Sequence, residues 1–107
     1  FGMLEDRGET MKTNPNLTLI AYGMTGDFLS SLAFQAVNQV KTKLSQSLKV
    51  NQIQVLSETE AYRNWGFLEL PVTVLYWEDQ PLLEMAGFQS AHSLIFQITD
   101  FLKRRDF

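Results

Sequence analysis

The feature that most constrains the fold is an apolar strand followed by a long amphipathic helix and a second apolar strand. Residues 17–22, Leu-Thr-Leu-Ile-Ala-Tyr, are typical of a strand buried on both faces, and Gly23 is expected to end it. Apolar residues then recur at helical spacing: Leu29, Leu32, Ala33, Ala36, Val37, Val40 and Leu44. Residues 50–56 predict a second core strand. This order predicts a right-handed βαβ unit with parallel strands.

The middle of the chain predicts a short helix and a hairpin. Ser57 and Glu60 have the spacing of a capping box, and Gly66 is expected to end the helix that they begin. β-Branched and aromatic residues at 72–77 predict a strand, and residues 82–86 predict its returning partner after a turn. Antiparallel pairing of this hairpin with the βαβ unit would give a mixed sheet of four strands covered by helices.

Further elements are predicted at the two ends of the chain. Ser90 can cap a last amphipathic helix near the C-terminus. Residues 1–16 are interpreted as an N-terminal segment with a short strand or a helix around residues 5–11, and residues 17–107 as one domain. Residues 1–2 precede the first methionine, so we interpret them as a truncation edge or a remnant of expression and give them no functional weight.

The composition excludes several classes of protein. The chain has 107 residues, of which 45% are hydrophobic and 20% are charged, so it has the size of one domain and is too apolar for disorder. No apolar run approaches the roughly 18 to 20 residues of a membrane-spanning helix. We therefore expect no membrane insertion. The net charge of −3 leaves no basic face to bind phosphate groups, so we expect no nucleic-acid partner. The N-terminus lacks the pattern of a signal peptide, which favours a cytoplasmic location.

The absence of cysteine is the sharpest exclusion. It removes disulfides, thiolate metal sites and cysteine nucleophiles at once. His92, the single histidine, has no second ligand at metal spacing and is interpreted as a surface residue. Two pairs of neighbouring carboxylates are interpreted as solvated rather than catalytic: Glu58 with Glu60, and Glu78 with Asp79. We therefore expect no metal, no cofactor and no catalytic residue.

Residues 65–72, Trp-Gly-Phe-Leu-Glu-Leu-Pro-Val, resemble a motif of the thioredoxin family. Thioredoxins carry an aromatic residue and glycine, and then Ile-x-Gly-Ile-Pro-Thr, before the third core strand. Gly87 follows Pro71 by sixteen residues, as a glycine does in that family. The likeness covers residues 17–102. It implies an α/β fold, the thioredoxin-like three-layer α/β/α sandwich with a mixed four- to five-stranded sheet, and a cis bond between Leu70 and Pro71.

The redox residues of the family are missing together. Residues 24–28, Met-Thr-Gly-Asp-Phe, stand where the family has Trp-Cys-Gly-Pro-Cys, so Thr25 and Phe28 replace both cysteines. Leu19 stands at the position of a buried aspartate, and Ala33 at that of a helix-kinking proline. The bulky Phe28 favours a naturally redox-inactive member of the family. The degenerate redox-motif positions are Thr25, Gly26, Asp27 and Phe28, and Thr25 is expected to cap the long helix with help from Asp27.

The resemblance also implies a surface for a partner. In the family, the backbone before the cis proline pairs with an extended peptide, which here would be the backbone of Leu70. The residues implied to bind a partner are Met24, Glu69, Leu70, Pro71, Ala86, Gly87 and Phe88, with Val55 on the same surface. Met24, Leu70 and Phe88 would form an apolar patch that suits protein contact. The alternative is that the cis bond only shapes the turn and that Phe88 folds back onto the core.

Three functions remain open at this stage. The first is a redox-inactive protein- or peptide-binding module with an adaptor, assembly or chaperone-like role, whose partner is an unidentified protein or peptide. The second is a structural or oligomerisation domain with contacts elsewhere, a homo-oligomer included. The third is a non-redox enzyme that uses Thr25, Asp27 and Glu69, which has the least support because no pair of base and nucleophile is visible.

Overall fold

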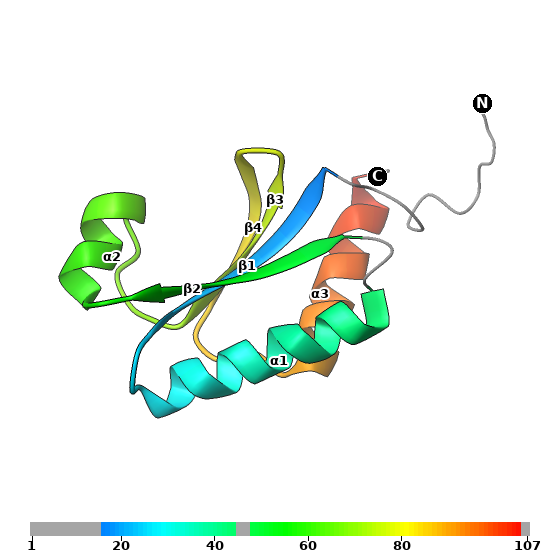
Figure 1. Cartoon of the computed structure of the whole chain (residues 1–107). Helices are drawn as coiled ribbons and strands as arrows, with labels where there is room; N and C mark the ends of the chain where they lie inside the picture. The colour runs from blue at the N-terminus through cyan, green and yellow to red at the C-terminus, as the bar shows by residue number, and fades with distance from the viewer. Residues whose placement is uncertain (1–15, 45–47, 106–107) are drawn as a thin grey trace.

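The computed structural model describes residues 16–44 and 48–105 of the chain (Figure 1). Its strands are β1 (Leu17–Met24), β2 (Lys49–Val55), β3 (Val72–Trp77) and β4 (Gln80–Ala86). Its helices are α1 (Phe28–Leu44), α2 (Glu58–Trp65) and α3 (Ala91–Arg104). The expected order of elements is confirmed, and the element suggested around residues 5–11 lies outside the described residues.

The four strands form one mixed sheet in the order β2-β1-β3-β4. β1 pairs with β2 in parallel, so β1, α1 and β2 form the expected βαβ unit. β3 pairs antiparallel with both β1 and β4, which makes β3 and β4 the expected hairpin. In the described part of the chain the sheet therefore has four strands, the lower number of the predicted range.

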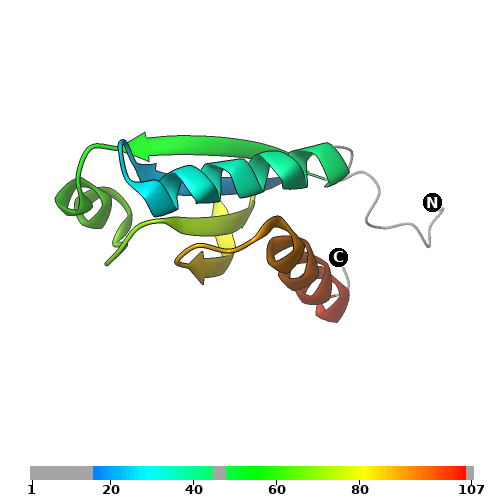
Figure 2. The ribbon, with the colours of Figure 1, turned by 90° about the horizontal axis from the view of Figure 1, so that it is seen from below.

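The helices cover the two faces of the sheet unequally (Figures 1 and 2). α1 and α3 lie on one face, where the larger core cluster includes Leu19, Val37, Leu75 and Ile98. α2 and the loop that follows it lie at one end of the sheet and pack on the opposite face, in a smaller cluster that includes Tyr22, Val55, Phe67 and Val72. Among the described residues the third layer of the sandwich is therefore small, and α2 is the helix that contributes to it.

The predicted helix caps are confirmed. At the start of α2, the backbone N–H of Glu60 donates to the Ser57 hydroxyl at 3.1 Å. Gly66 ends the helix with φ of 78°, and its N–H donates to the carbonyl of Tyr62 at 2.8 Å. A glycine adopts this left-handed conformation without steric penalty, which explains the sharp end of α2. At the start of α3, the Ser90 hydroxyl caps the helix in the same way as Ser57.

Gly23 does not end β1, because the strand continues through it to Met24. A Cβ built at Gly23 would lie 2.6 Å from the Cβ of Ser30 and 3.0 Å from Cζ of Phe34. The glycine is needed because α1 crosses very close to β1 at this point, and not because the chain turns there. The same contact buries Ser30 and leaves Leu29, which was predicted to lie on the buried stripe, 49% exposed.

We predict that Gly23→Ala lowers the free energy of unfolding by about 1 to 3 kcal/mol, because the added methyl group overpacks the contact between α1 and β1. Urea denaturation analysed by linear extrapolation measures the change. Ser31→Ala, at an exposed position of the same helix, is the control and should change stability by less than about 0.5 kcal/mol.

The double variant Gly23→Ala with Ser30→Gly tests the cause of that effect. Removing the Ser30 side chain vacates the space that the new methyl group needs, so the two changes should destabilise less together than the sum of their separate effects. Strictly additive effects would show that crowding against Ser30 is not what requires a glycine at position 23.

Candidate functional site

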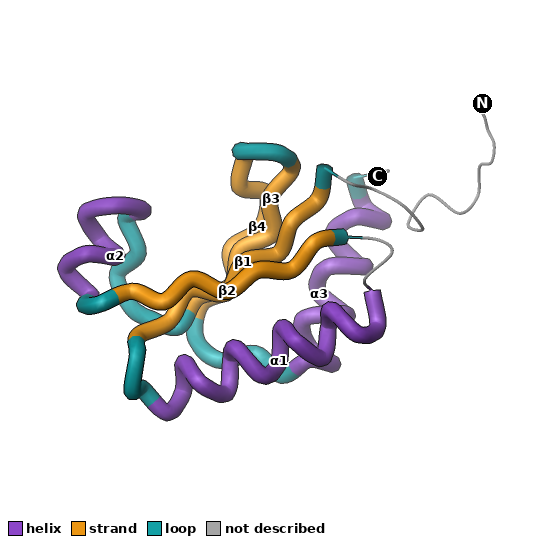
Figure 3. Tube along the Cα trace, viewed as in Figure 1, coloured by secondary structure: helices purple, strands orange, loops and turns teal. Residues whose placement is uncertain are grey.

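Three loops meet at one end of the sheet, between β1 and α1, before β3 and after β4 (Figure 3). The strand register brings them together, because Tyr22 pairs with Val72 and Val72 pairs with Ala86. The backbone N–H of Gly87 donates to the carbonyl oxygen of Pro71 at 2.9 Å and joins two of the loops directly. These loops, with the residues that flank them on the strands and on α1, carry Met24, Phe28, Glu69, Leu70, Pro71, Ala86, Gly87 and Phe88. We call these residues the loop surface.

The backbone of Leu70 is the centre of the loop surface. The peptide bond between Leu70 and Pro71 is cis. Among the described residues, no hydrogen bond engages the backbone N–H or carbonyl of Leu70. The Leu70 side chain is half-buried and packs against the smaller core cluster. A main-chain donor and acceptor without hydrogen-bond partners are able to pair with the backbone of another extended chain.

Large apolar side chains of the loop surface are exposed. Phe28, the first residue of α1, is 73% exposed, and Phe88 is 40% exposed. Phe88 belongs to neither core cluster, so the alternative in which it folds back onto the core is wrong. Val55 does not lie on this surface, because the last residue of β2 points into the smaller core cluster and is 1% exposed. Glu69 is exposed.

Asp27, and not Thr25, caps α1. The backbone N–H and the hydroxyl of Ser30 both donate to Asp27 Oδ2, at 2.9 and 2.8 Å. Thr25 is exposed, and its hydroxyl donates to Gln54 Oε1 at 3.3 Å. Gly26 between them has φ of 84°, which turns the chain so that the aspartate rather than the threonine precedes the helix. The prediction that Thr25 caps the helix with help from Asp27 is therefore wrong, because Asp27 itself provides the cap.

Ser30 is a structural residue that the sequence analysis missed. It is fully buried, and its hydroxyl oxygen also accepts a hydrogen bond from the backbone N–H of Met24 at 2.9 Å. The hydroxyl thereby ties the end of β1 to the first turn of α1. The spacing of Asp27 and Ser30, an aspartate three residues before a serine, is the pattern that could have indicated this cap.

A cluster of aromatic rings lies beside the loop surface. The ring of Tyr22 is 4.9 Å from the ring of Trp65 and 4.8 Å from the ring of Phe67, between centroids. The hydroxyls of Tyr22 and Tyr76 are hydrogen-bonded at 2.6 Å. Burial, and then this hydrogen bond, raises the pKa of Tyr22 well above its usual range, so its hydroxyl is neutral at pH 7.

The remaining polar residues singled out in the sequence do not converge. His92 is exposed on α3. Glu60 is not simply solvated, because its carboxylate accepts a hydrogen bond from the backbone N–H of Leu56 at 2.8 Å. Residues 16–44 and 48–105 contain no group of three carboxylate or histidine side chains that could hold a metal ion. Among the helices that the structure describes, none is long and apolar enough to cross a bilayer.

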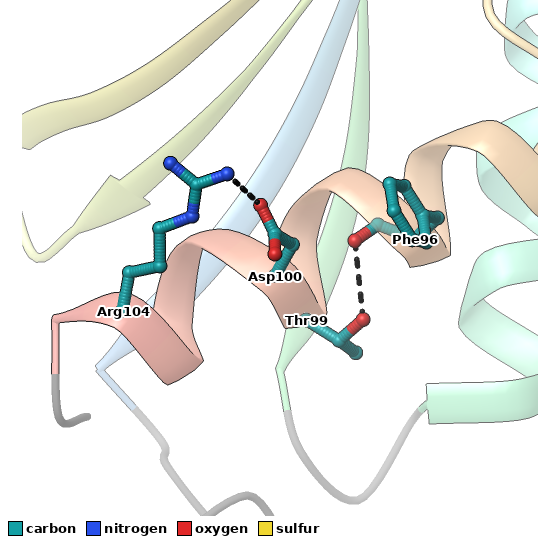
Figure 4. A network of polar contacts seen from close by, with 4 residues as sticks. All are labelled: Phe96, Thr99, Asp100 and Arg104. Carbon is teal, nitrogen blue, oxygen red and sulfur yellow. Dashed lines mark hydrogen bonds and ion pairs between the residues drawn. The ribbon is translucent and has the colours of Figure 1, made fainter.

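The outer face of α3 carries a separate set of contacts, away from the loop surface (Figure 4). Arg104 Nη2 lies 3.0 Å from Asp100 Oδ2, one helical turn before it. The Thr99 hydroxyl donates to the carbonyl of Phe96 at 3.2 Å. The Phe96 ring is 65% exposed. This exposed phenylalanine is a useful reference for Phe28 and Phe88, because it has the same chemistry on a different element.

Comparison with known proteins finds likeness at the level of structure. No family model and no curated protein matches the chain. The structure is similar to thioredoxin-2, a component of the protein secretion machinery of the malaria parasite, with a TM-score of 0.70 and 12% identity over 92% of this chain and 99% of that one. It is also similar to chloroplastic thioredoxin z, with a TM-score of 0.66 and 18% identity over 86% of this chain and 80% of that one. A malarial protein matches with a TM-score of 0.67 and 14% identity, over 83% and 99% of the two chains.

Identities this low establish the fold and leave the activity of this chain to its own residues. The mixed sheet with its three helices agrees with these structures, so the predicted fold class is confirmed. Thiol–disulfide exchange requires a thiolate, and the chain contains no cysteine. The protein therefore has the thioredoxin-like fold without the thiol chemistry that thioredoxins perform.

Proposed function

We propose that the protein is a redox-inactive binding module that holds an extended segment of a partner protein against the loop surface. The observation that carries this proposal is the backbone of Leu70, which has no hydrogen-bond partner among the described residues and lies between loops with exposed apolar side chains. A segment added to such a backbone gains main-chain hydrogen bonds, and the neighbouring side chains select its sequence.

The chemistry of the loop surface favours an apolar segment. Phe28 is a large aromatic residue at the start of α1 whose ring is exposed and does not belong to the core. Exposed aromatic rings of this kind are typical of protein contact sites. Met24 has a flexible side chain that adapts to different partners. Glu69 adds one negative charge, which disfavours an acidic partner segment and suits a neutral or basic one.

The other two functions have weaker support. For an enzyme, the carboxylate of Asp27 is already engaged by Ser30, and the hydroxyl of Thr25 donates to Gln54 with no base beside it. A structural or oligomerisation domain remains the alternative, since Leu68 is also exposed outside the loop surface. Adaptor, assembly and chaperone-like roles would all use the same surface, and a cytoplasmic location is part of the proposal.

We predict that a partner cross-links to the loop surface and not to the outer face of α3. A photoreactive phenylalanine analogue at position 28 or 88, in the full chain expressed in its native host, should give the same adduct, detected by mass spectrometry. The same analogue at position 96 is the matched control, because the exposed fraction of Phe96, 65%, lies between the 73% of Phe28 and the 40% of Phe88. The adducts should disappear with Leu70→Glu, which puts a charge in the middle of the surface.

Once the partner is identified, Phe28→Ala and Phe88→Ala should each weaken its binding by about 1 to 3 kcal/mol and leave the unfolding free energy nearly unchanged, since both rings are exposed. Isothermal titration calorimetry measures the first quantity and urea denaturation the second. Equal cross-linking from position 96, or an affinity that neither alanine variant changes, would refute the loop surface and favour the structural alternative.

We also predict that the protein does not reduce disulfides. The rate at which insulin precipitates in dithiothreitol should equal the rate without protein, because a threonine hydroxyl at position 25 cannot cycle through a disulfide. A cysteine-containing thioredoxin is the positive control. Acceleration above the background in a homogeneous preparation would contradict the prediction.

A further inference from the structure

α1 and α3 lie on one face of the sheet (Figure 1). The opposite face contains a hollow of about 400 Å³. Its floor is β1, because Thr18, Ile20 and Tyr22 alternate toward this face along the strand. The rest of the lining comes from the end of α2, from β3 and from the hairpin turn: Trp65, Tyr76, Glu78 and Asp79. Glu78 and Asp79 follow β3 whereas Pro71 precedes it, so this end of the hollow is remote from Pro71. The other end lies closer to Pro71, because Tyr22 pairs with Val72.

One end of the hollow is aromatic. Trp65 is 39% exposed and packs on Tyr22, whose hydroxyl is hydrogen-bonded to that of Tyr76. The faces of tryptophan and tyrosine rings carry partial negative charge and attract cations. The half-buried Ile20 adds an aliphatic contact between the aromatic end and Thr18.

The other end of the hollow is acidic. Glu78 and Asp79 are exposed in the turn between β3 and β4. The turn is fixed to the start of β1, because the backbone N–H of Glu78 donates to the carbonyl of Asn16 at 2.8 Å. Neither carboxylate has an ion-pair partner in the part of the chain that the structure describes. Of the residues that the structure describes, no basic one lines the hollow, although Lys49 pairs with Thr18 on the neighbouring strand.

We propose that this hollow binds an arginine side chain of a partner protein. The guanidinium group would pair with Glu78 and Asp79, and its planar face or its alkyl stem would lie on the rings of Tyr76 and Trp65. Arginine fits better than lysine because its flat guanidinium both stacks on aromatic rings and forms paired hydrogen bonds with carboxylates. Two carboxylates that have no ion-pair partner among residues 16–44 and 48–105 repel phosphate groups and other anions, so their charge favours a cation.

The shape of the hollow favours a protein side chain over a free small molecule. From Thr18 to Tyr22 the floor extends for about 13 Å along the strand, at roughly 3.3 Å per residue. It is shallow and open to solvent on one side, whereas sites for small molecules usually enclose most of the ligand surface. A side chain held by a larger interface does not need that enclosure. This proposal is independent of the loop surface.

The test is an NMR titration of the full ¹⁵N-labelled chain with the capped tripeptide acetyl-Gly-Arg-Gly-amide. The matched control is the same tripeptide with citrulline, which has nearly the shape of arginine without its charge. We expect saturable shifts of the Trp65 indole N–H and the Glu78 backbone amide, with a dissociation constant on the order of 1 mM. The citrulline peptide should bind at least about tenfold more weakly.

Two double variants distinguish binding in the hollow from a general effect of the protein's net charge. Glu78→Gln with Asp79→Asn should weaken binding of the arginine peptide at least about fivefold, and both residues are exposed, so the fold should be retained. Glu58→Gln with Glu84→Gln changes the net charge equally outside the hollow and should leave binding unchanged. Equal losses in the two variants, or equal binding of the citrulline peptide, would overturn the proposal. Agmatine binding more tightly than the tripeptide would overturn the assignment to a protein side chain.

Discussion

The close approach of α1 to β1 is the contact on which the rest of the structure depends. Gly23 allows it, because any side chain there would collide with the buried Ser30. The Ser30 hydroxyl then accepts from the N–H of Met24 and donates to Asp27, so one side chain holds the end of the strand and the cap of the helix together. The first residue of α1, Phe28, is fixed at the surface by this junction, which gives the loop surface its most exposed ring.

The same junction determines what the helix start can bind. The N-terminal end of a helix carries a partial positive charge that stabilises anions, which is the property that lowers the pKa of a cysteine thiol in such a place. In this chain the carboxylate of Asp27 occupies that end and already accepts two hydrogen bonds from Ser30. The N-terminus of α1 therefore already interacts with the carboxylate of Asp27 and is not available to an external anion. A proposed partner would instead contact the apolar side chains and the backbone of Leu70.

The sequence predicted the elements well and the close contacts poorly. Periodic apolar residues and the caps at Ser57 and Ser90 report on local structure, and those elements lie within a few residues of their predicted bounds. Gly23 was misinterpreted because a glycine that ends a strand and a glycine that admits a helix look the same in one sequence. The hollow was missed for a similar reason: Tyr22 and Tyr76 are 54 residues apart, and only the register of β1 with β3 brings their hydroxyls together.

The two proposed contacts have complementary chemistry: the loop surface lies at the start of β3, and the carboxylates of the hollow lie in the turn after its end. The strand from Val72 to Trp77 spans about 17 Å at roughly 3.3 Å per residue, so a single partner protein is large enough to reach both. Apolar burial and main-chain pairing at the loop surface supply affinity but distinguish poorly between apolar segments. A carboxylate pair beside aromatic rings adds discrimination, because a partner without a cation in the right position leaves the charges unpaired. If both contacts form, the partner is selected by the position of its positive charge as well as by its apolar surface.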